Sequence, residues 1–393
     1  MKTLLHFLTI ATLFSPICLQ AATLQVGPGK QYPTPCAALA VAADGDTILV
    51  DPVLYKGDVC AFSQNDLTIR GVNGRAHIDA AGKIAQQKGI WVPSGRNLTV
   101  ENMEFSGAAI SAENGNNGAG IRASGTNWTV INCYFHDNQD GILESNIADS
   151  NIVIEFSEFA RNGAGDGQSH NLYIGHTNSL IFRFNYSHDA NVGHLLKTRS
   201  ATNYILYNRL TGENGTESYE TDVPNGGTTY FIGNLVQQGP TTQNSGMLSY
   251  MLEGSNPANP GSDLYVINNS FVNQRPNGGT FVSIGSADAV PALIQNNIFY
   301  GPGTQSNQGN SVLESNFAGD PKFININRYD YRLKPGSPAI GTATSTGFSS
   351  EGYPLRPEFQ YVHPACGEFR FTASDIGAYA FHNDGERVNC RKP

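Results

Sequence analysis

The chain has 393 residues, only 15% of them charged, and its formal net charge at pH 7 is −9. This acidic balance excludes duplex nucleic acid as an expected partner, because phosphate binding needs a basic face. The 43 glycines and the few charged side chains favour turn-rich β structure, since long helices need surfaces of Ala, Glu, Lys and Leu. Apolar residues, at 39%, are numerous enough for a core, so a disordered chain is also excluded.

Residues 1–22 have the pattern of a secretory signal. Lys2 gives a positive start, the stretch from Leu4 to Leu13 is apolar but too short to span a bilayer, and Ala21 and Ala22 are small enough for cleavage. No later apolar run reaches about 18 residues, so no membrane span is expected. We therefore expect a secreted or periplasmic protein.

Five cysteines remain once Cys18 leaves with the signal, and export would allow disulfides among them. Two local pairs, Cys36–Cys60 and Cys366–Cys390, would each staple one end of the chain. Cys133 lies inside a hydrophobic repeat, and we expect it to be a buried, unpaired thiol.

That repeat occupies the middle of the chain, with a unit of about 24 residues. Each unit has a turn residue, three or four strand-forming residues, often a small polar turn, and then an aromatic residue or Leu. The eight anchors are Phe105, Phe135, Phe159, Tyr186, Leu210, Leu235, Phe271 and Phe299. A second short strand lies upstream in each unit and leaves no room for a crossover helix. Such units bury their apolar faces only by stacking, so the anchors should form one inward stack.

This repeat resembles the right-handed parallel β-helix of the pectate lyase superfamily, over roughly Asp66 to Phe323. The predicted fold is all-β, with an N-terminal cap and first coils over 23–84, a parallel β-helix over 85–330, and a C-terminal cover over 331–393 stapled by Cys366–Cys390. By the same resemblance, a short helix around Cys36 to Ala43 covers the open end of the rod. DPKF, YRLKPGSPAIG and DIGAY resemble the closing segment of secreted β-helix proteins.

Polar side chains from three successive coils are predicted to form one outward patch. Aligning the units places Tyr173, Lys197 and Asp222 in one outward column and Asn171, Leu195 and Glu220 in the next. His170 and His194 also align, and Arg199 lies two residues after Lys197. The window 161–215 holds five Lys or Arg against three Asp or Glu, in a chain that is acidic overall. The predicted patch contains His170, Tyr173, His194, Lys197, Arg199, Glu220 and Asp222, with His176 and Arg209 as further substrate contacts.

The family resemblance implies what such a patch could do. β-Helix lyases, such as alginate lyases and chondroitinase B, divide proton removal and carboxylate neutralisation among Lys, Arg and often Ca²⁺. By this resemblance Lys197 or His170 would take the C5 proton of a uronate, with His194 in the same catalytic set. Arg199 would neutralise the substrate carboxylate, and Glu220 and Asp222 would bind Ca²⁺. The predicted function is a lyase, acting as a monomer, that cleaves a uronic-acid-containing polysaccharide by β-elimination.

Other functions stay open at this point. A glycoside hydrolase needs two carboxylates facing a groove, which Glu217, Glu220 and Asp222 could supply, although the basic patch would then be unexplained. A uronan epimerase is another enzymatic alternative. A non-enzymatic carbohydrate-binding surface protein would present an aromatic face without clustered titratable groups.

Overall fold

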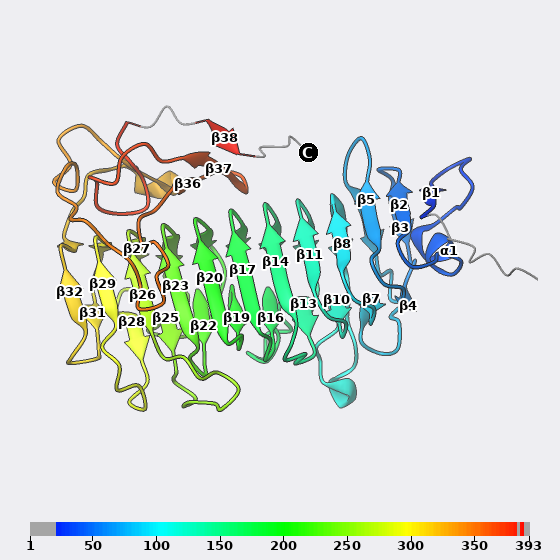
Figure 1. Cartoon of the computed structure of the whole chain (residues 1–393), viewed down its shortest axis with the longest axis horizontal. Helices are drawn as coiled ribbons and strands as arrows, with labels where there is room; N and C mark the ends of the chain where they lie inside the picture. The colour runs from blue at the N-terminus through cyan, green and yellow to red at the C-terminus, as the bar shows by residue number, and fades with distance from the viewer. Residues whose placement is uncertain (1–20, 383–385, 389–393) are drawn as a thin grey trace, which may run out of the picture.

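The computed structural model describes residues 21–382 and 386–388. These residues form a right-handed parallel β-solenoid, in which each coil adds strands to three parallel sheets that run the length of the rod (Figure 1). The predicted signal segment lies outside the described residues except for Ala21 and Ala22. Among the described residues, none of the helices has the length and apolar character needed to cross a bilayer.

Sheet A has 12 strands, sheet B has 11 and sheet C has 10, which is more coils than the repeat alone indicates. Sheet A consists of β1 (Thr23–Val26), β2 (Thr47–Val50), β5 (Thr68–Gly71), β8 (Leu98–Glu101), β11 (Trp128–Ile131), β14 (Asn151–Glu155), β17 (Ser179–Arg183), β20 (Thr202–Leu206), β23 (Thr228–Ile232), β26 (Leu264–Ile267), β29 (Leu293–Gln295) and β32 (Val312–Glu314). Sheet B consists of β3 (Leu54–Lys56), β6 (Ala76–Asp79), β9 (Met103–Ser106), β12 (Tyr134–His136), β15 (Glu158–Ala160), β18 (Tyr186–His188), β21 (Arg209–Thr211), β24 (Leu235–Gln238), β27 (Ser270–Asn273), β30 (Ile298–Tyr300) and β33 (Phe317–Ala318). Sheet C consists of β4 (Cys60–Phe62), β7 (Gly89–Pro93), β10 (Ala119–Ala123), β13 (Asp140–Glu144), β16 (Leu172–Ile174), β19 (Lys197–Thr198), β22 (Thr221–Val223), β25 (Gly246–Tyr250), β28 (Thr280–Ile284) and β31 (Thr304–Ser306).

The corner between sheets A and B explains why Asn recurs ahead of the anchors. One residue at this corner adopts a left-handed backbone, for example Asn132 at φ 51° and Asn268 at φ 52°, and Asn tolerates that conformation well. The next residue builds a buried ladder from coil to coil. The Asn208 amide donates to Oδ1 of Asn234 at 2.9 Å, and the Asn234 amide donates to Oδ1 of Asn269 at 2.8 Å. The ladder satisfies buried backbone groups that the turn would otherwise leave unpaired.

The predicted inward stack is correct for six of the eight anchors. The Phe105, Phe135 and Phe159 rings stack with centroids 5.1 Å apart at each step, and all three side chains are buried. Tyr186 and Leu235 are exceptions, because Phe159 pairs with Ser187 rather than with Tyr186. The inward positions in these two coils are therefore Ser187 and Val236.

The physical reason for the two exceptions is that the turn sets the register. The inward residue comes third after the left-handed residue of the corner, so left-handed Phe184 leads to Ser187 and left-handed Gly233 leads to Val236. Tyr186 therefore points outward from sheet B, as does Leu235. An alignment on the most hydrophobic residue selects the wrong member of the strand, since side chains alternate between the two faces.

The N-terminal end of the rod is capped as the resemblance implies. Helix α1 (Pro35–Leu39) is shorter than the predicted segment, and it buries Ala38 and Leu39 against the first coils at the blue end of Figure 1. The Cys36–Cys60 disulfide is present, and Cys133 is a free, buried thiol. Burial raises the pKa of Cys133 to about 12, so this thiol is inert at neutral pH.

The C-terminal segment lies along the flank of the rod and not across its open end (Figure 1). It contains β34 (Phe323–Asn325), η2 (Ile326–Arg328), β35 (Asp330–Leu333), β36 (Phe359–Val362), β37 (Cys366–Phe369) and β38 (Arg387–Val388). Another short 3-10 helix, η1 (Ala112–Asn114), lies in the solenoid between β9 and β10. It packs on the outer faces of sheets A and B, where it buries Leu235 and Tyr230. In the last strand of sheet A, Val312 and Leu313 are 48% and 52% exposed. Cys390 lies outside the described residues, so the Cys366–Cys390 disulfide stays a prediction.

Candidate functional site

The outward column predicted on sheet C forms in the structure. Tyr173 on β16 pairs with Lys197 on β19, and Lys197 pairs with Asp222 on β22, so the three side chains come from neighbouring coils at the same level. Ser249 on β25 continues the column and donates its hydroxyl to Oδ1 of Asp222 at 2.8 Å. This column is the centre of the candidate site.

Two cations stand beside the Tyr173 ring and share one carboxylate. Nζ of Lys197 lies 3.3 Å from Oδ2 of Asp222 and 3.5 Å from Oε1 of Glu253. Nη2 of Arg199 lies 2.7 Å from Oε2 of Glu253, and its Nε donates to the Tyr173 hydroxyl at 2.7 Å. The Lys197 and Arg199 side chains are 12% and 15% exposed, whereas Glu253 is 49% exposed. Glu253 is therefore the accessible member of the ion-pair cluster.

The loop of residues 251–263, between β25 and β26, brings Glu253 to the site. Asn256 of the same loop lies 3.3 Å from Nε2 of His176, so the loop also contacts the predicted substrate residue of an earlier coil. Glu253 could not be predicted from the sequence, because it follows Lys197 by 56 residues and belongs to an insert with no repeat pattern. The insert does lengthen the spacing between the anchors Leu235 and Phe271 to 36 residues, which indicates a loop but not where it packs.

His170 and His194 are positioned as predicted relative to each other, but their nitrogens are already engaged. The two rings stack with centroids 4.5 Å apart, and both side chains are buried. Nδ1 of His170 accepts the backbone N–H of His194 at 3.0 Å, and Nδ1 of His194 accepts that of Tyr219 at 3.2 Å. A ring that accepts at Nδ1 carries its hydrogen at Nε2, so each imidazole offers a donor and not a base.

The electrostatics of the two histidines agree with this geometry. Burial lowers the pKa of His194 to about 3, with smaller effects from the Lys197 and Arg199 cations. Burial also places the pKa of His170 well below its ordinary value. Nε2 of His194 lies 3.5 Å from Oδ2 of Asp222, which orients that carboxylate toward Lys197. These histidines therefore connect the coils and position the site.

The second predicted column points inward, which corrects the placement of Glu220. Asn171, Leu195 and Glu220 are all fully buried. Strand alternation does not extend to them, because each lies at the corner before its strand begins, and β22 starts only at Thr221. Burial first, and the neighbouring Glu217 second, raise the pKa of Glu220 well above its ordinary value. Glu220 is thus an interior group whose ionised form is disfavoured by burial.

Calcium does not fit the two carboxylates predicted to hold it. Glu220 is fully buried and its ionised form is disfavoured, while Asp222 already faces the Lys197 ammonium. Ca²⁺ requires about six to eight oxygen ligands, with ionised carboxylates among them. The positive charge of this site comes instead from Lys197 and Arg199.

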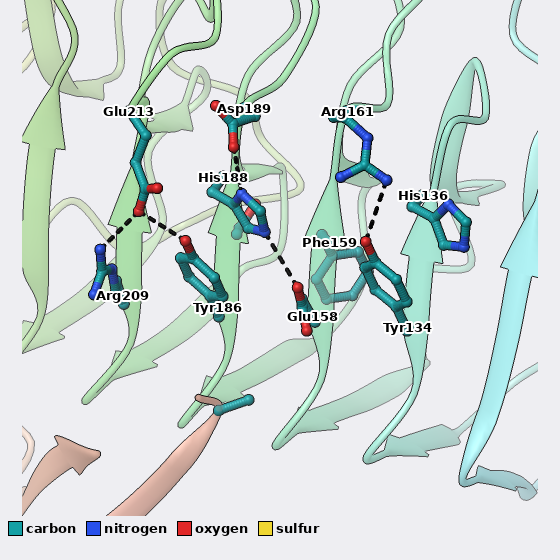
Figure 2. A network of polar contacts seen from close by, with 12 residues as sticks. Tyr134, His136, Glu158, Phe159, Arg161, Tyr186, His188, Asp189, Arg209 and Glu213 are labelled. Carbon is teal, nitrogen blue, oxygen red and sulfur yellow. Dashed lines mark hydrogen bonds and ion pairs between the residues drawn. The ribbon is translucent and has the colours of Figure 1, made fainter. Parts of the chain in front are cut away.

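Arg209, predicted as a substrate contact of the same patch, lies on a different sheet. It belongs to β21 of sheet B, where its Nη2 pairs with Oε1 of Glu213 at 2.7 Å (Figure 2). The same oxygen accepts the Tyr186 hydroxyl at 2.7 Å. Arg209 therefore belongs to a separate polar network beneath the C-terminal segment.

Comparisons with known proteins agree with this architecture. A family model described as right handed beta helix region matches residues 59–236. The pectate lyase Pel9A structure is similar, with a TM-score of 0.63 and 14% identity over 92% of this chain and 96% of that one. The ORF18 protein of Geobacillus virus E2 has a TM-score of 0.40 with 14% identity over 72% and 55% of the two chains. A mutant of the PL6 family alginate lyase AlyGC has a TM-score of 0.36 with 13% identity over 93% and 59%.

The comparison with curated proteins finds no match. At 14% identity the likeness to Pel9A shows a shared fold alone, and the two lower TM-scores add nothing to that conclusion. The chain is therefore a right-handed parallel β-helix protein that shares its architecture with a pectate lyase. Its activity has to be argued from its own side chains.

Proposed function

We propose that the protein is an exported polysaccharide lyase that cleaves a uronic-acid-containing polysaccharide by β-elimination on the outer face of sheet C. The observation that carries the proposal is the pairing of Lys197 and Arg199 around one half-exposed carboxylate, Glu253. A substrate carboxylate has the same charge and shape as Glu253 and can take its place on Arg199. The shared fold with a pectate lyase and the Cys36–Cys60 disulfide, which suits an oxidising compartment, support the proposal.

The proposed reaction assigns one role to each side chain. Arg199 binds and neutralises the uronate carboxylate, which makes the charge that develops at C5 tolerable. The Lys197 ammonium first gives a proton to solvent, and the resulting amine takes the C5 proton. The electron pair of that C–H bond forms the C4–C5 double bond, and the bond from C4 to O4 breaks. The Tyr173 hydroxyl, held by Arg199, stands in the same patch to protonate the departing O4. No step uses calcium.

The alternatives have less support from the same residues. Paired carboxylates for a hydrolase would have to face a groove, but Glu217 and Glu220 are fully buried. An aromatic binding face does exist on sheet A, where the Tyr204, Tyr230 and Tyr265 rings stack with centroids 5.1 and 5.4 Å apart. Tyr353 of the C-terminal segment packs on that column, and Tyr230 is only 1% exposed. The cationic patch on sheet C is the better-supported site.

The test is incubation of the mature protein with a panel of polyuronates and glycosaminoglycans. Ultraviolet absorbance of the unsaturated uronate would be followed, because only eliminative cleavage produces it. On the substrate that wild type cleaves, Lys197→Met should lower kcat by about 10²–10⁴-fold, the usual contribution of a general base. Arg199→Ala should lower kcat/KM on the order of 10²-fold or more through lost charge stabilisation.

Arg183→Ala is the matched control, because Arg183 also forms an outward Arg–carboxylate pair, with Glu155 at 2.5 Å, but on sheet A. It should keep the full rate. Full activity of folded Lys197→Met, or hydrolysis without an unsaturated product, would refute the assignment. Activity should also survive a calcium chelator.

A further inference from the structure

A second cluster of titratable side chains lies on the outer face of sheet B, remote from the lyase patch in the chain's topology. His77 on β6, Glu104 on β9 and His136 on β12 come from three successive coils. Oε1 of Glu104 lies 3.5 Å from Nδ1 of His77 and 3.0 Å from Nε2 of His136. Among the described residues, this is one of two groups whose three ligand-type atoms all lie within 4.8 Å of one another.

Both imidazoles are oriented by hydrogen bonds at the nitrogens that face away from Glu104. Nε2 of His77 lies 2.7 Å from the Ser106 hydroxyl, and Nδ1 of His136 lies 2.6 Å from Oδ2 of Asp137. Arg161 in turn holds Asp137, with Nη2 at 2.8 Å from the same oxygen. Histidine ligands of metals are commonly fixed in this way, by a hydroxyl, carbonyl or carboxylate on the second nitrogen.

The spacing of the three atoms suits a tetrahedral ion. Zn²⁺ binds nitrogen and carboxylate oxygen at about 2.0–2.1 Å, which places neighbouring ligand atoms about 3.3 Å apart. The observed 3.0 and 3.5 Å bracket that value. Two imidazoles and a carboxylate favour Zn²⁺ or Co²⁺ over Ca²⁺ or Mg²⁺, which prefer oxygen ligands.

Exposure and charge also fit an ion that is open to solvent. The side chains of His77, Glu104 and His136 are 27%, 24% and 14% exposed, so a water molecule has access to a fourth position. Asp79 faces His77 and adds negative charge, whereas Arg75 acts on Glu104 in the opposite sense. Arg161 is already paired with Asp137.

We propose that His77, Glu104 and His136 bind one Zn²⁺ ion, with a fourth coordination position open to solvent. On binding, the ion replaces the hydrogen bond between Nε2 of His136 and Oε1 of Glu104.

The chain contains a near-copy of this arrangement two coils further on, which serves as a control (Figure 2). Nδ1 of His188 lies 2.6 Å from Asp189 and its Nε2 lies 3.3 Å from Glu158, as in the His136 group. In the first group, His77 lies one coil before Glu104 in the same outward column. In the second group, the residue one coil before Glu158 in that column is Tyr134, so the second imidazole is missing. The remaining carboxylate near His188, Glu213, is already paired with Arg209.

The experiment uses the protein without its predicted signal segment and without a histidine tag, after removal of bound metal with a chelator. Zn²⁺ binding is measured by calorimetry, and Co²⁺ binding by visible ligand-field absorption. Wild type should bind one ion per chain. His77→Gln and Glu104→Gln should abolish that stoichiometric site, and Asp137→Asn should weaken it by about 10–100-fold, as expected for a group that orients a ligand. His188→Gln should bind as wild type does.

Thermal unfolding gives an independent readout. Zn²⁺ should raise the unfolding midpoint of wild type and of His188→Gln, but not that of His77→Gln, because only a native-state site shifts the equilibrium. Circular dichroism of the metal-free variants checks that they are folded, and Glu104→Gln replaces His77→Gln if the latter is not. Absence of saturable binding, or equal binding by wild type and the folded ligand variants, overturns the proposal. Lyase activity is not a readout here, so this test and that of the lyase function are independent.

Discussion

Buried carboxyl groups make single residues of this chain sensitive to pH. Glu217 and Glu220 are both fully buried at the corner that leads into sheet C. Burial raises the pKa of Glu217 from 4.5 to about 7, although the Gly239 amide donates to its Oε1 at 3.2 Å and opposes that rise. The folded state therefore holds a proton on Glu217 at pH values where the unfolded chain has released it.

The first prediction concerns the stability that this proton provides. The pKa of Glu217 is higher in the folded state than in the unfolded chain. The protonated carboxyl therefore contributes its full share to the free energy of unfolding below pH 4.5, and this share is lost as the pH rises through about 7. At 1.36 kcal/mol per pKa unit, the loss amounts to about 3 kcal/mol. Glu217→Gln keeps an acceptor for Gly239 but cannot ionise, so its free energy of unfolding should fall less between pH 5 and pH 8.

Denaturant unfolding at the two pH values measures this difference. The matched control is Glu113→Gln, which changes an exposed carboxylate on η1 and should follow wild type at both pH values. An equal loss of stability in wild type and Glu217→Gln would show that Glu217 is ionised in the folded state at both.

At the scale of the elements, the position of each inward side chain follows from the left-handed corner residue. Phe159 is third after left-handed Phe156, and its ring lies between those of Phe135 and Phe182. Tyr186, which the hydrophobic repeat places in the same column, is instead outside the core. Its hydroxyl donates to Glu213, and its ring meets that of His363 with centroids 5.0 Å apart.

Substitutions at the two positions should therefore differ. Phe159→Ala leaves a cavity in the stack and should cost about 3–5 kcal/mol of unfolding free energy. Tyr186→Phe removes one hydrogen bond to Glu213, which keeps Arg209 as a partner, and should cost only about 0.5–1.5 kcal/mol. Equilibrium denaturation of both variants measures the difference. Similar costs would contradict the register described for β18.

How much of this architecture the sequence could predict depends on the residue concerned. The stacked coils, the Cys36–Cys60 disulfide and the Tyr173–Lys197 alignment follow from local spacing, whereas the α1 cap follows from the family resemblance. Glu220 was misplaced because alternation fails where a strand meets a corner. Glu253 could not be predicted, because the loop after β25 brings it back across two coils to β19, and nothing in its local sequence indicates where the loop packs.

The His77 cluster was missed for a related reason. The His136-Asp137 pair recurs in the sequence as His188-Asp189, but the partners of His136 lie in the two preceding coils. Pairing along the rod joins residues about one coil apart in sequence, so a site of this kind appears only when all coils are in register. The register of each coil is set by its left-handed corner residue and cannot be inferred from its most hydrophobic residue.

At the scale of the whole molecule, the C-terminal segment decides which faces of the rod are available. Within the described chain it packs on the outer faces of sheets A and B in the later coils, through two apolar clusters separate from the main core. The Tyr173–Lys197–Asp222 column lies on sheet C, and the His77 cluster lies on the early coils of sheet B. Both candidate sites are thus on surfaces that the apolar contacts of the segment leave free.

The attachment of this segment can be tested with one buried and one exposed apolar residue. Leu355 has no exposed surface and packs in the cluster with Tyr230 and Tyr207, whereas Phe348 in the same segment is 71% exposed. Leu355→Asp would place an unpaired carboxylate among those aromatic rings. It should lower the free energy of unfolding by at least about 2–5 kcal/mol, which is the usual loss when a buried leucine is truncated to alanine. Limited proteolysis should then cut the segment of residues 334–358 faster than in wild type.

Phe348→Asp is the matched control and should leave both the cleavage rate and the unfolding midpoint unchanged, because its ring is already in solvent. The main core and the Tyr173–Lys197–Asp222 column belong to the solenoid itself, so folded Leu355→Asp should keep the proposed lyase activity and the proposed Zn²⁺ binding at temperatures below its lowered midpoint. If the C-terminal segment and the coils unfold together in a single transition, they form one cooperative unit. A solenoid whose coils contact only their neighbours predicts the opposite, namely release of the segment before the rod unfolds.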